Sequence, residues 1–255
     1  MNNNDIYRHS DRHEKTTYSA EKIANILDYY ISYNSVIDVG CGVGTFLTIF
    51  EKRGVKDIVG IDSSKYVDLD LLEINREKFI DSDLEDPPVM NRKFDLALSL
   101  EVAEHLQPEY AEEFVRYLTN LSNIVCFSAA VPGQGGIEHI NEQWQDYWVN
   151  LFKQHGYCAV DCIRSEIWSD EKVLDWYAQN TILYVKEDIL KNNSELLSFH
   201  VNNAQNKIRI VHPTRFTKKI NEIENLRNQI RKLKAPSFKK SLKYLVKSLF
   251  VKNDR

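Results

Sequence analysis

The residues best placed to do chemistry lie in one glycine-rich segment, in which Asp38, Gly40, Gly42 and Gly44 occupy alternate positions. The residues before Gly40 form a short apolar run, as in a strand buried on both faces, and those from Thr45 onward have the apolar spacing of a helix. Such a junction gathers backbone N–H groups into a concave nest, and glycines let a ligand approach the backbone closely. The segment therefore predicts a binding site for a nucleotide-like ligand, in which the carboxylate of Asp38 attracts a cationic amine.

The spacing of these glycines distinguishes the segment from two other nucleotide-binding loops. A dinucleotide fingerprint has the order G-x-G-x-x-G, and a phosphate-binding loop ends in Gly-Lys-Ser/Thr. Here the order is Asp-x-Gly-x-Gly-x-Gly with no lysine after it, which resembles the first motif of the class I S-adenosylmethionine (SAM)-dependent methyltransferases. Asp62 closes the next apolar run, 22 residues after Gly40, where it can accept hydrogen bonds from both hydroxyls of a ribose.

This resemblance implies which residues bind SAM. In the family, an acidic residue after the third strand reaches the adenine amino group and an apolar neighbour covers the ring; Asp83 and Leu84 occupy those positions. The residues expected to bind the cofactor are Asp38, Gly40, Cys41, Gly42, Asp62, Ser63, Asp83, Leu84 and Glu101.

Apolar runs that alternate with helical segments indicate the elements that position these residues. Five such runs, over residues 36–39, 57–62, 78–81, 94–100 and 124–128, favour a parallel sheet with helices on both faces. Two more follow at residues 157–164 and 181–185, and the resemblance implies an antiparallel closing strand. We therefore expect an α/β, Rossmann-like class I methyltransferase fold with a seven-stranded, mostly parallel sheet. Ser19 is expected to cap the helix that precedes the first strand.

A second group of polar residues follows the fifth strand, between Ala130 and Trp148. Its proline and glycines are typical of a mobile lid, and its polar and aromatic side chains suit a polyhydroxylated ligand. In the alternative interpretation, the polar groups cap the helix that starts near Glu142 and the tryptophans belong to the core. The residues expected to hold the acceptor are Gln134, Asn141, Glu142, Tyr177 and Asn180.

Methyl transfer from a sulfonium is an in-line displacement, and a hydroxyl acceptor must lose its proton as the new bond forms. His139 is the first candidate for the catalytic base. His105 is the second, because Glu101 four residues earlier could orient it; alternatively, His105 packs at a helix N-terminus. Glu138, His139 and Glu142 could supply metal ligands, but hard cations usually bind a denser set of carboxylates, so we expect no metal.

Three segments carry a more specific resemblance, which spans about residues 34–186: FDLALSLEVAEHL, SAAVPGQGGIEHINEQWQDYW and WYAQNTILYV. They look like a group of bacterial methyltransferases associated with surface-polysaccharide and nucleotide-sugar modification. The resemblance implies O-methylation of a nucleotide-activated sugar or glycan precursor of the capsular-polysaccharide or lipopolysaccharide type. Two alternatives stay open, namely methylation of a non-sugar small molecule on nitrogen or phosphate, and a non-catalytic SAM-binding scaffold.

The net charge of −4 gives no indication of nucleic-acid binding, although the charge is unevenly distributed. Residues 216–255 carry +9 and the preceding residues carry −13. The apolar runs are too short to span a membrane, and the N-terminal sequence lacks the pattern of a signal peptide. The four cysteines are interpreted as free thiols, so we expect a cytoplasmic protein.

The sequence divides into a methyltransferase domain at residues 1–190 and a helical, basic extension at residues 191–255. An apolar seam suited to helix pairing, as in a homodimer, recurs in the extension at steps of three and four residues. It consists of Ile220, Ile223, Leu226, Ile230 and Leu233. A basic amphipathic segment after Pro236 suits an anionic membrane, at its inner face, or an acidic partner; alternatively, it packs on the acidic body or in a dimer.

Overall fold

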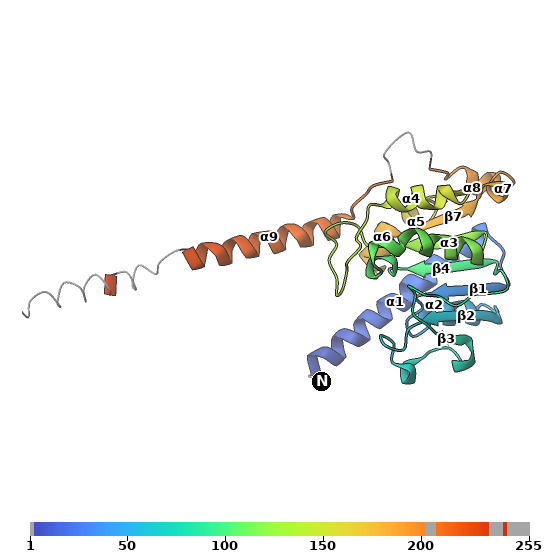
Figure 1. Cartoon of the computed structure of the whole chain (residues 1–255). Coiled ribbons are helices and arrows are strands. Elements are labelled where there is room, and N and C mark those ends of the chain that lie inside the picture. The colour runs from blue at the N-terminus through green and yellow to red at the C-terminus, as the bar shows by residue number, and fades with distance from the viewer. Residues whose placement is uncertain (1–2, 202–207, 235–241, 244–255) are drawn as a thin grey trace, which may run out of the picture. The chain divides into compact units, whose positions relative to one another are not determined.

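A computed structural model describes residues 3–201, 208–234 and 242–243 of a chain that divides into two compact units, Met1–His212 and Pro213–Arg255. The first unit is an α/β domain (Figure 1). Its strands are β1 Ser35–Val39, β2 Asp57–Asp62, β3 Phe79–Asp81, β4 Leu96–Leu100, β5 Ile124–Ser128, β6 Tyr157–Val160 and β7 Ile182–Lys186. Its α-helices are α1 Asn3–Tyr30, α2 Thr45–Lys52, α3 Ala111–Leu121, α4 Gln145–Gln154, α5 Arg164–Ile167, α6 Asp175–Asn180, α7 Glu187–Leu190 and α8 Ser194–Leu197.

The strands form one seven-stranded sheet in the order β3-β2-β1-β4-β5-β7-β6. β1 pairs in parallel with β2 and β4, and β3 and β5 extend the parallel part on either side. β7 runs antiparallel to both β5 and β6. The predicted seven-stranded, mostly parallel Rossmann-like sheet is therefore confirmed, together with its antiparallel closing strand.

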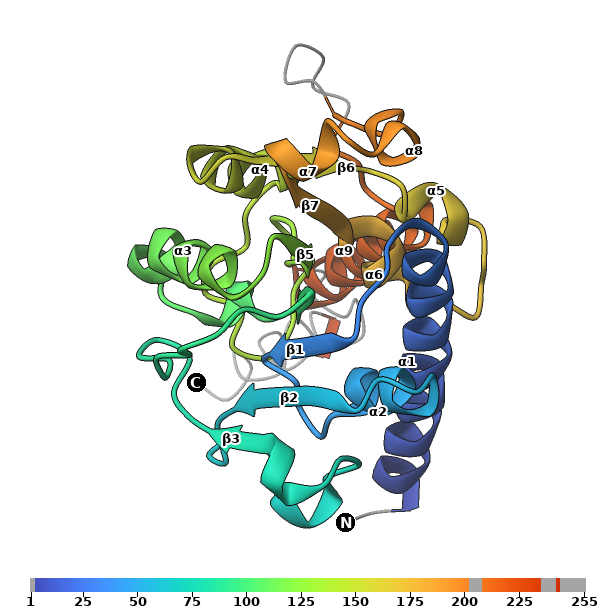
Figure 2. The same cartoon turned by 90° about the vertical axis from the view of Figure 1, so that its right-hand side faces the viewer.

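Helices cover both faces of this sheet (Figure 2). Each face has its own apolar core. On one face, α1 and α2 contribute Ile23, Leu27 and Phe50, which are almost completely buried. On the other face, α3 and α4 contribute Phe114 and Trp148. Because both faces are covered by apolar side chains, polar groups that must meet a ligand are placed at the strand ends.

One prediction about the helices is wrong, because Ser19 does not cap the first helix. α1 begins at Asn3 and continues through Ser19 to Tyr30. The Ser19 hydroxyl donates to the carbonyl of Lys15 at 2.7 Å and accepts the backbone N–H of Leu174 at 3.0 Å. A serine that bonds a carbonyl four residues earlier is tolerated inside a helix, and here it also joins α1 to the segment before α6.

The strand predicted at residues 157–164 is shorter than expected and ends at Val160. Cys158 lies on β6, and Cys162 lies beyond the end of this strand. All four cysteines are free.

The first unit also includes residues 191–201 and 208–212, which the sequence analysis assigned to the extension. Leu196 and Ile208 are buried in the two apolar cores. The backbone N–H of Asp161 donates to the carbonyl of Phe199 at 3.0 Å, and the buried guanidinium of Arg164 donates to the carbonyl of Ile208 at 2.9 Å. These contacts make residues up to His212 part of the body that carries the site.

The second unit contains α9, which spans Pro213–Lys234. The predicted apolar seam is exposed on this helix, with 39–50% of the surface accessible at Ile220, Ile223, Leu226 and Ile230. Pairing of this seam with a second chain stays a prediction. The basic segment after residue 236 lies outside the described residues except for 242–243, so its membrane contact also stays a prediction. Within the described ranges, no helix is both long and apolar enough to cross a membrane.

Candidate functional site

The candidate site lies at the carboxyl ends of the parallel strands, where ligands bind in open α/β sheets. The glycine loop follows β1, Asp62 ends β2, and Glu101 comes directly after β4. Residues 129–144 follow β5, and α6 leads into the antiparallel β7 at the same edge. The strand order therefore collects at one edge polar residues that are widely separated in the sequence.

The glycine loop has a backbone that suits a ligand cradle. Gly40 (φ 86°) and Gly42 (φ 55°) both adopt positive φ. A Cβ at Gly40 would lie 2.2 Å from the side chain of Val102, so packing requires glycine at this position. A Cβ at Gly42 would meet no atom of the described residues within 4 Å, so Gly42 faces open space where a ligand can lie.

The carboxylate of Asp62 holds this loop from the neighbouring strand. It accepts the backbone N–H groups of Gly42 and Ser63, both at 2.7 Å. Burial raises the pKa of Asp62, while the two hydrogen bonds and the nearby His105 act in the opposite direction. Each carboxylate oxygen has a second lone pair, so Asp62 keeps the capacity to accept the hydroxyls of a ribose.

Asp38 is the buried acid of the site, with 3% of its surface exposed. Burial, and to a smaller extent the charge of Asp62, raises the pKa of Asp38 to about 7. A ligand that brings positive charge next to Asp38 favours its ionised form and is attracted by it. The electrostatics of this position therefore agree with the expectation of a cationic group bound here.

The residues expected to contact the adenine lie after β3. Asp83 is exposed and Leu84 is half-buried. The carboxylate of Asp83 accepts the N–H of Glu85 at 3.0 Å, and the carboxylate of Glu85 accepts the N–H of Gln107 at 2.9 Å. This loop is thereby tied to the segment after β4.

Cys41, in the glycine loop, is buried, and burial raises the pKa of its thiol.

Glu101 comes directly after β4 in a left-handed conformation (φ 58°) that residues other than glycine rarely adopt. Its carboxylate accepts hydrogen bonds from Gln134 Nε2 at 2.8 Å and from Asn180 Nδ2 at 3.0 Å. The Oε1 atom of Gln134 in turn accepts from Asn180 at 2.9 Å and from Gln179 at 3.1 Å. The three amides are buried, so this network fixes Glu101 and joins the segment after β5 to α6.

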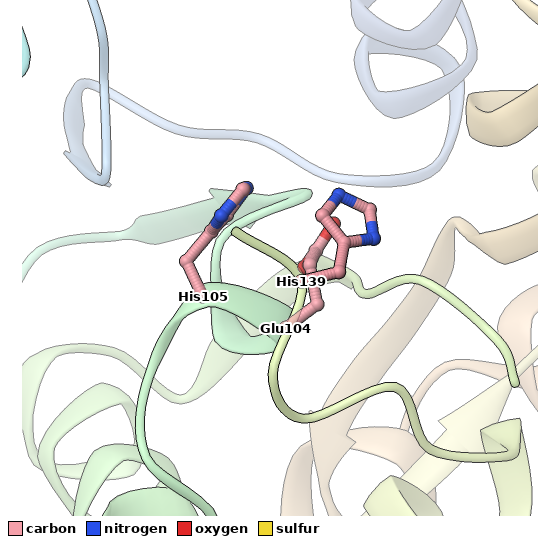
Figure 3. A group of neighbouring side chains, drawn as sticks. All are labelled: Glu104, His105 and His139. Carbon is pink, nitrogen blue, oxygen red and sulfur yellow. The ribbon is translucent and has the colours of Figure 1, made fainter. Parts of the chain in front are cut away.

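Glu104, His105 and His139 converge from two segments next to Glu101 (Figure 3). One nitrogen or oxygen atom from each of the three side chains lies within 4.8 Å of the others. The two imidazoles meet edge to face with their centroids 4.9 Å apart. Glu104 is fully buried, and burial together with the charge of Glu101 raises its pKa well above the ordinary value.

Glu142 positions His139 within this cluster. Its carboxylate accepts the N–H groups of Gly133 and Gly135, both at 2.6 Å, and lies 3.1 Å from His139 Nδ1. Burial acts to raise the pKa of Glu142, but the hydrogen bonds from Gly135, His139 and Gly133 outweigh it and lower that pKa. The ionised carboxylate favours the His139 tautomer with its proton on Nδ1, which leaves the lone pair on Nε2. Desolvation and the neighbouring His139 lower the pKa of His105, so His105 is neutral at pH 7.

Two residues expected to hold the acceptor have structural contacts. Asn141 is buried and donates through Nδ2 to the carbonyl of Ala103 at 3.2 Å, which fastens the segment after β5. Tyr177 packs edge to face against Phe46 in the core, with ring centroids 5.5 Å apart. Their contacts with an acceptor stay predictions, as do those of Gln134, Glu142 and Asn180.

Sequence reasoning missed two residues of the site, Glu104 and Gln179. The signal for Glu104 is the order Glu101-x-x-Glu104-His105, which places two carboxylates and an imidazole in the first turn after a strand at the ligand-binding edge. Gln179 has no such signal, because its partner Gln134 is 45 residues earlier in the chain.

Comparisons with known proteins agree with this geometry. Residues 10–160, more than half of the chain, match the family model described as a methyltransferase domain. No protein with a curated description matches the sequence.

Several solved structures are similar in fold. The plantazolicin methyltransferase BpumL in complex with a monoazolic desmethylPZN analog and SAH is 14% identical over 71% of this chain and 86% of that chain, with a TM-score of 0.50. Magnesium protoporphyrin IX methyltransferase (ChlM) from Synechocystis PCC 6803 with bound SAM is 18% identical over 68% and 79%, with a TM-score of 0.49. DesVI of Streptomyces venezuelae is 16% identical over 73% and 99%, with a TM-score of 0.49. At 14% identity, the likeness to BpumL shows the fold alone, the Rossmann-like fold of class I methyltransferases.

Proposed function

We propose that this chain, which belongs to the methyltransferase-domain family, transfers a methyl group from SAM to a hydroxyl of a nucleotide-activated sugar or glycan precursor. The chain is a SAM-dependent methyltransferase. What we propose is its acceptor, a precursor of the capsular-polysaccharide or lipopolysaccharide type. One observation supports a hydroxyl acceptor: His139, oriented by Glu142, lies against His105 at the ligand-binding edge. A hydroxyl must lose a proton when it is methylated, whereas a neutral amine attacks without a base.

The residues at the ends of β1 and β2 fit SAM. Gly42 faces open space, Asp62 has lone pairs left for a ribose, and the buried Asp38 is favoured in its ionised form by a positive charge. Asp83 and Leu84 are expected to contact the adenine, as the family resemblance implies. Bound there, SAM supplies a methyl group carried on a positively charged sulfur.

In this proposal an imidazole removes the proton from the acceptor hydroxyl. With the Nδ1 proton of His139 held by Glu142, Nε2 is the atom that takes the hydroxyl proton. The oxygen–carbon bond forms as the sulfur–carbon bond breaks, and the electron pair of the broken bond stays on sulfur. His105, neutral at pH 7, is the second candidate for this role.

A panel of nucleotide sugars incubated with the full chain and SAM tests the acceptor. We expect one member of the panel to gain the mass of one methyl group, with formation of one equivalent of S-adenosylhomocysteine. A matched panel of amines and phosphates serves as the comparison. SAM binding without methylation of any sugar, together with turnover of an amine or phosphate, would contradict the sugar proposal and leave the methyltransferase activity in place.

The glycine loop gives a paired prediction about the donor. Gly42→Ala places a methyl group in the space expected for SAM and is expected to weaken SAM binding about 10- to 100-fold, at a steric cost of ~1–3 kcal/mol. Gly40→Ala instead drives a Cβ into Val102 and is expected to lower the free energy of unfolding by about 2–4 kcal/mol. Calorimetric titration with SAM and urea denaturation measure the two effects. Unchanged SAM affinity in Gly42→Ala would show that Gly42 does not face the ligand.

A further inference from the structure

We propose that Glu104, His105 and His139 form a binding site for a divalent first-row transition-metal ion, at which the acceptor hydroxyl is bound and loses its proton. This inference rests on the proposed function, because it assigns the hydroxyl-activating step of that same site to a cation. It departs from the sequence-based expectation that the enzyme needs no metal.

The three side chains have nearly the spacing that a metal ion requires. One atom from each lies within 4.8 Å of the others, and they converge from the turn after β4 and the segment after β5 (Figure 3). Ligand atoms bound at about 2.0–2.2 Å from one ion are about 3 Å apart. In the proposed site, a change in the side-chain torsions of the exposed His105 closes the remaining difference.

A second, independent observation comes from Glu104. Its side chain is fully buried, and neither carboxylate oxygen has a hydrogen bond of regular geometry within the described part of the chain. The backbone N–H groups of Glu104 and Ala130 and the carboxyl group of Glu101 are its neighbours, and the charge of Glu101 disfavours a second negative charge here. A buried carboxylate beside a second carboxylate is costly, and such groups are normally paired with cations or bound to metals. A cation in the cluster supplies a positive charge next to Glu104, which these neighbours do not.

The surrounding backbone holds the ligands in place as metal sites require. The carbonyl of Glu104 accepts the N–H groups of Ile140 and Asn141 at 2.9 and 3.0 Å, which fastens the His139 segment to the Glu104 turn. The carboxylate of Glu142 lies 3.1 Å from His139 Nδ1. A carboxylate that orients a histidine through one ring nitrogen commonly leaves the other nitrogen to bind a metal, here Nε2.

The ligand set indicates the class of ion. Two imidazoles and one carboxylate favour Mn²⁺, Co²⁺ or Zn²⁺ over Mg²⁺ and Ca²⁺, which prefer oxygen ligands. Three protein ligands leave a coordination position open for the acceptor. The cation lowers the pKa of the hydroxyl that it binds, the proton passes to water, and the oxygen then displaces sulfur from the methyl group. In this inference the imidazoles bind the cation through their lone pairs, and water replaces Nε2 of His139 as the group that takes the hydroxyl proton.

Metal binding is tested directly on the full chain after treatment with a chelator. Co²⁺ titration, followed by the visible absorption of the bound ion, is expected to saturate at one equivalent, and Mn²⁺ is expected to compete. Glu104→Gln and His139→Gln are each expected to lower Co²⁺ affinity at least about tenfold. His155→Gln, a histidine outside the site, serves as the control and is expected to bind Co²⁺ like the unaltered chain. Circular dichroism and SAM titration establish that each variant is folded.

The outcomes separate this inference from the proposed function. Absence of a Co²⁺ spectrum in a chain that binds SAM, or equal Co²⁺ affinity in the unaltered chain and Glu104→Gln, would overturn the metal site and leave sugar methylation standing. Full methyltransferase activity after chelation would also overturn the metal site and leave Nε2 of His139 as the group that takes the hydroxyl proton. Co²⁺ bound through Glu104 and His139 without methylation of any sugar would leave the site in place and remove the proposed acceptor.

Discussion

Replacing His139 with glutamine is expected to lower kcat by a factor on the order of 10²–10⁴, the usual contribution of a group that activates a nucleophile by removing its proton. Glutamine retains a side-chain amide that can donate to Glu142, but it offers no basic nitrogen to a proton or to a metal ion. Since His139 lies outside the glycine loop, the Kd for SAM is expected to change little. Steady-state kinetics with the accepted sugar and calorimetric titration with SAM measure the two quantities.

Two further variants control this experiment. His155→Gln removes a histidine at the end of α4 and is expected to keep the activity of the unaltered enzyme. Gly136→Ala keeps His139 but places a Cβ 2.1 Å from the position of its Nε2, so the imidazole has to move and a smaller loss of kcat is expected. Unchanged kcat in His139→Gln would remove His139 from the mechanism. A slight loss with an amine acceptor would instead favour methylation on nitrogen.

The parts of the site that sequence reasoning found are those set by short-range spacing. Asp38, Gly40 and Gly42 belong to one strand and its turn, and Asp62 ends the next apolar run, so strand alternation alone places all four at one edge. The strands were recognisable for the same reason, because strands covered on both faces are continuous apolar runs.

The parts that it missed depend on long-range contacts. The network of Glu101, Gln134 and Asn180 joins residues that are 33 and 79 positions apart, and no local pattern specifies their pairing. Ser19 has the residue type of a helix cap, yet its hydroxyl bonds Leu174, 155 positions away, inside a longer helix. Glu104 lies within an otherwise ordinary turn, and only the packing around it makes its carboxylate a buried group.

Replacing Asp38 with asparagine is expected to stabilise the protein without ligand and to weaken SAM binding. The pKa of Asp38 is raised to about 7, whereas an exposed aspartate has its ordinary value of 3.8. Between these two values the folded chain binds more protons at this position than the unfolded chain does. The contribution of this group to stability therefore falls as pH rises through that window, and the full penalty, on the order of 4 kcal/mol, is present above pH 7.

Asparagine cannot ionise, so the variant does not carry this penalty. The free energy of unfolding of Asp38→Asn minus that of the unaltered chain is expected to be nearly constant below pH 4, to rise between pH 4 and 7, and to level off above pH 8. Urea denaturation at a series of pH values measures this difference. Asp188→Asn, which removes one negative charge from an exposed position on α7, is the matched control and is expected to give a flat difference.

The same substitution removes the charge that attracts the donor. SAM carries a positive charge, so binding is favoured by ionised Asp38, and the affinity of the unaltered chain is expected to fall as pH drops below about 7. Asp38→Asn is expected to bind SAM at least about tenfold more weakly at pH 8, with that pH dependence lost. A variant that is more stable but binds the donor poorly would identify Asp38 as a residue kept for function at the expense of stability. A flat stability difference, or unchanged SAM affinity, would show that burial at this position does not perturb the carboxylate in the way described.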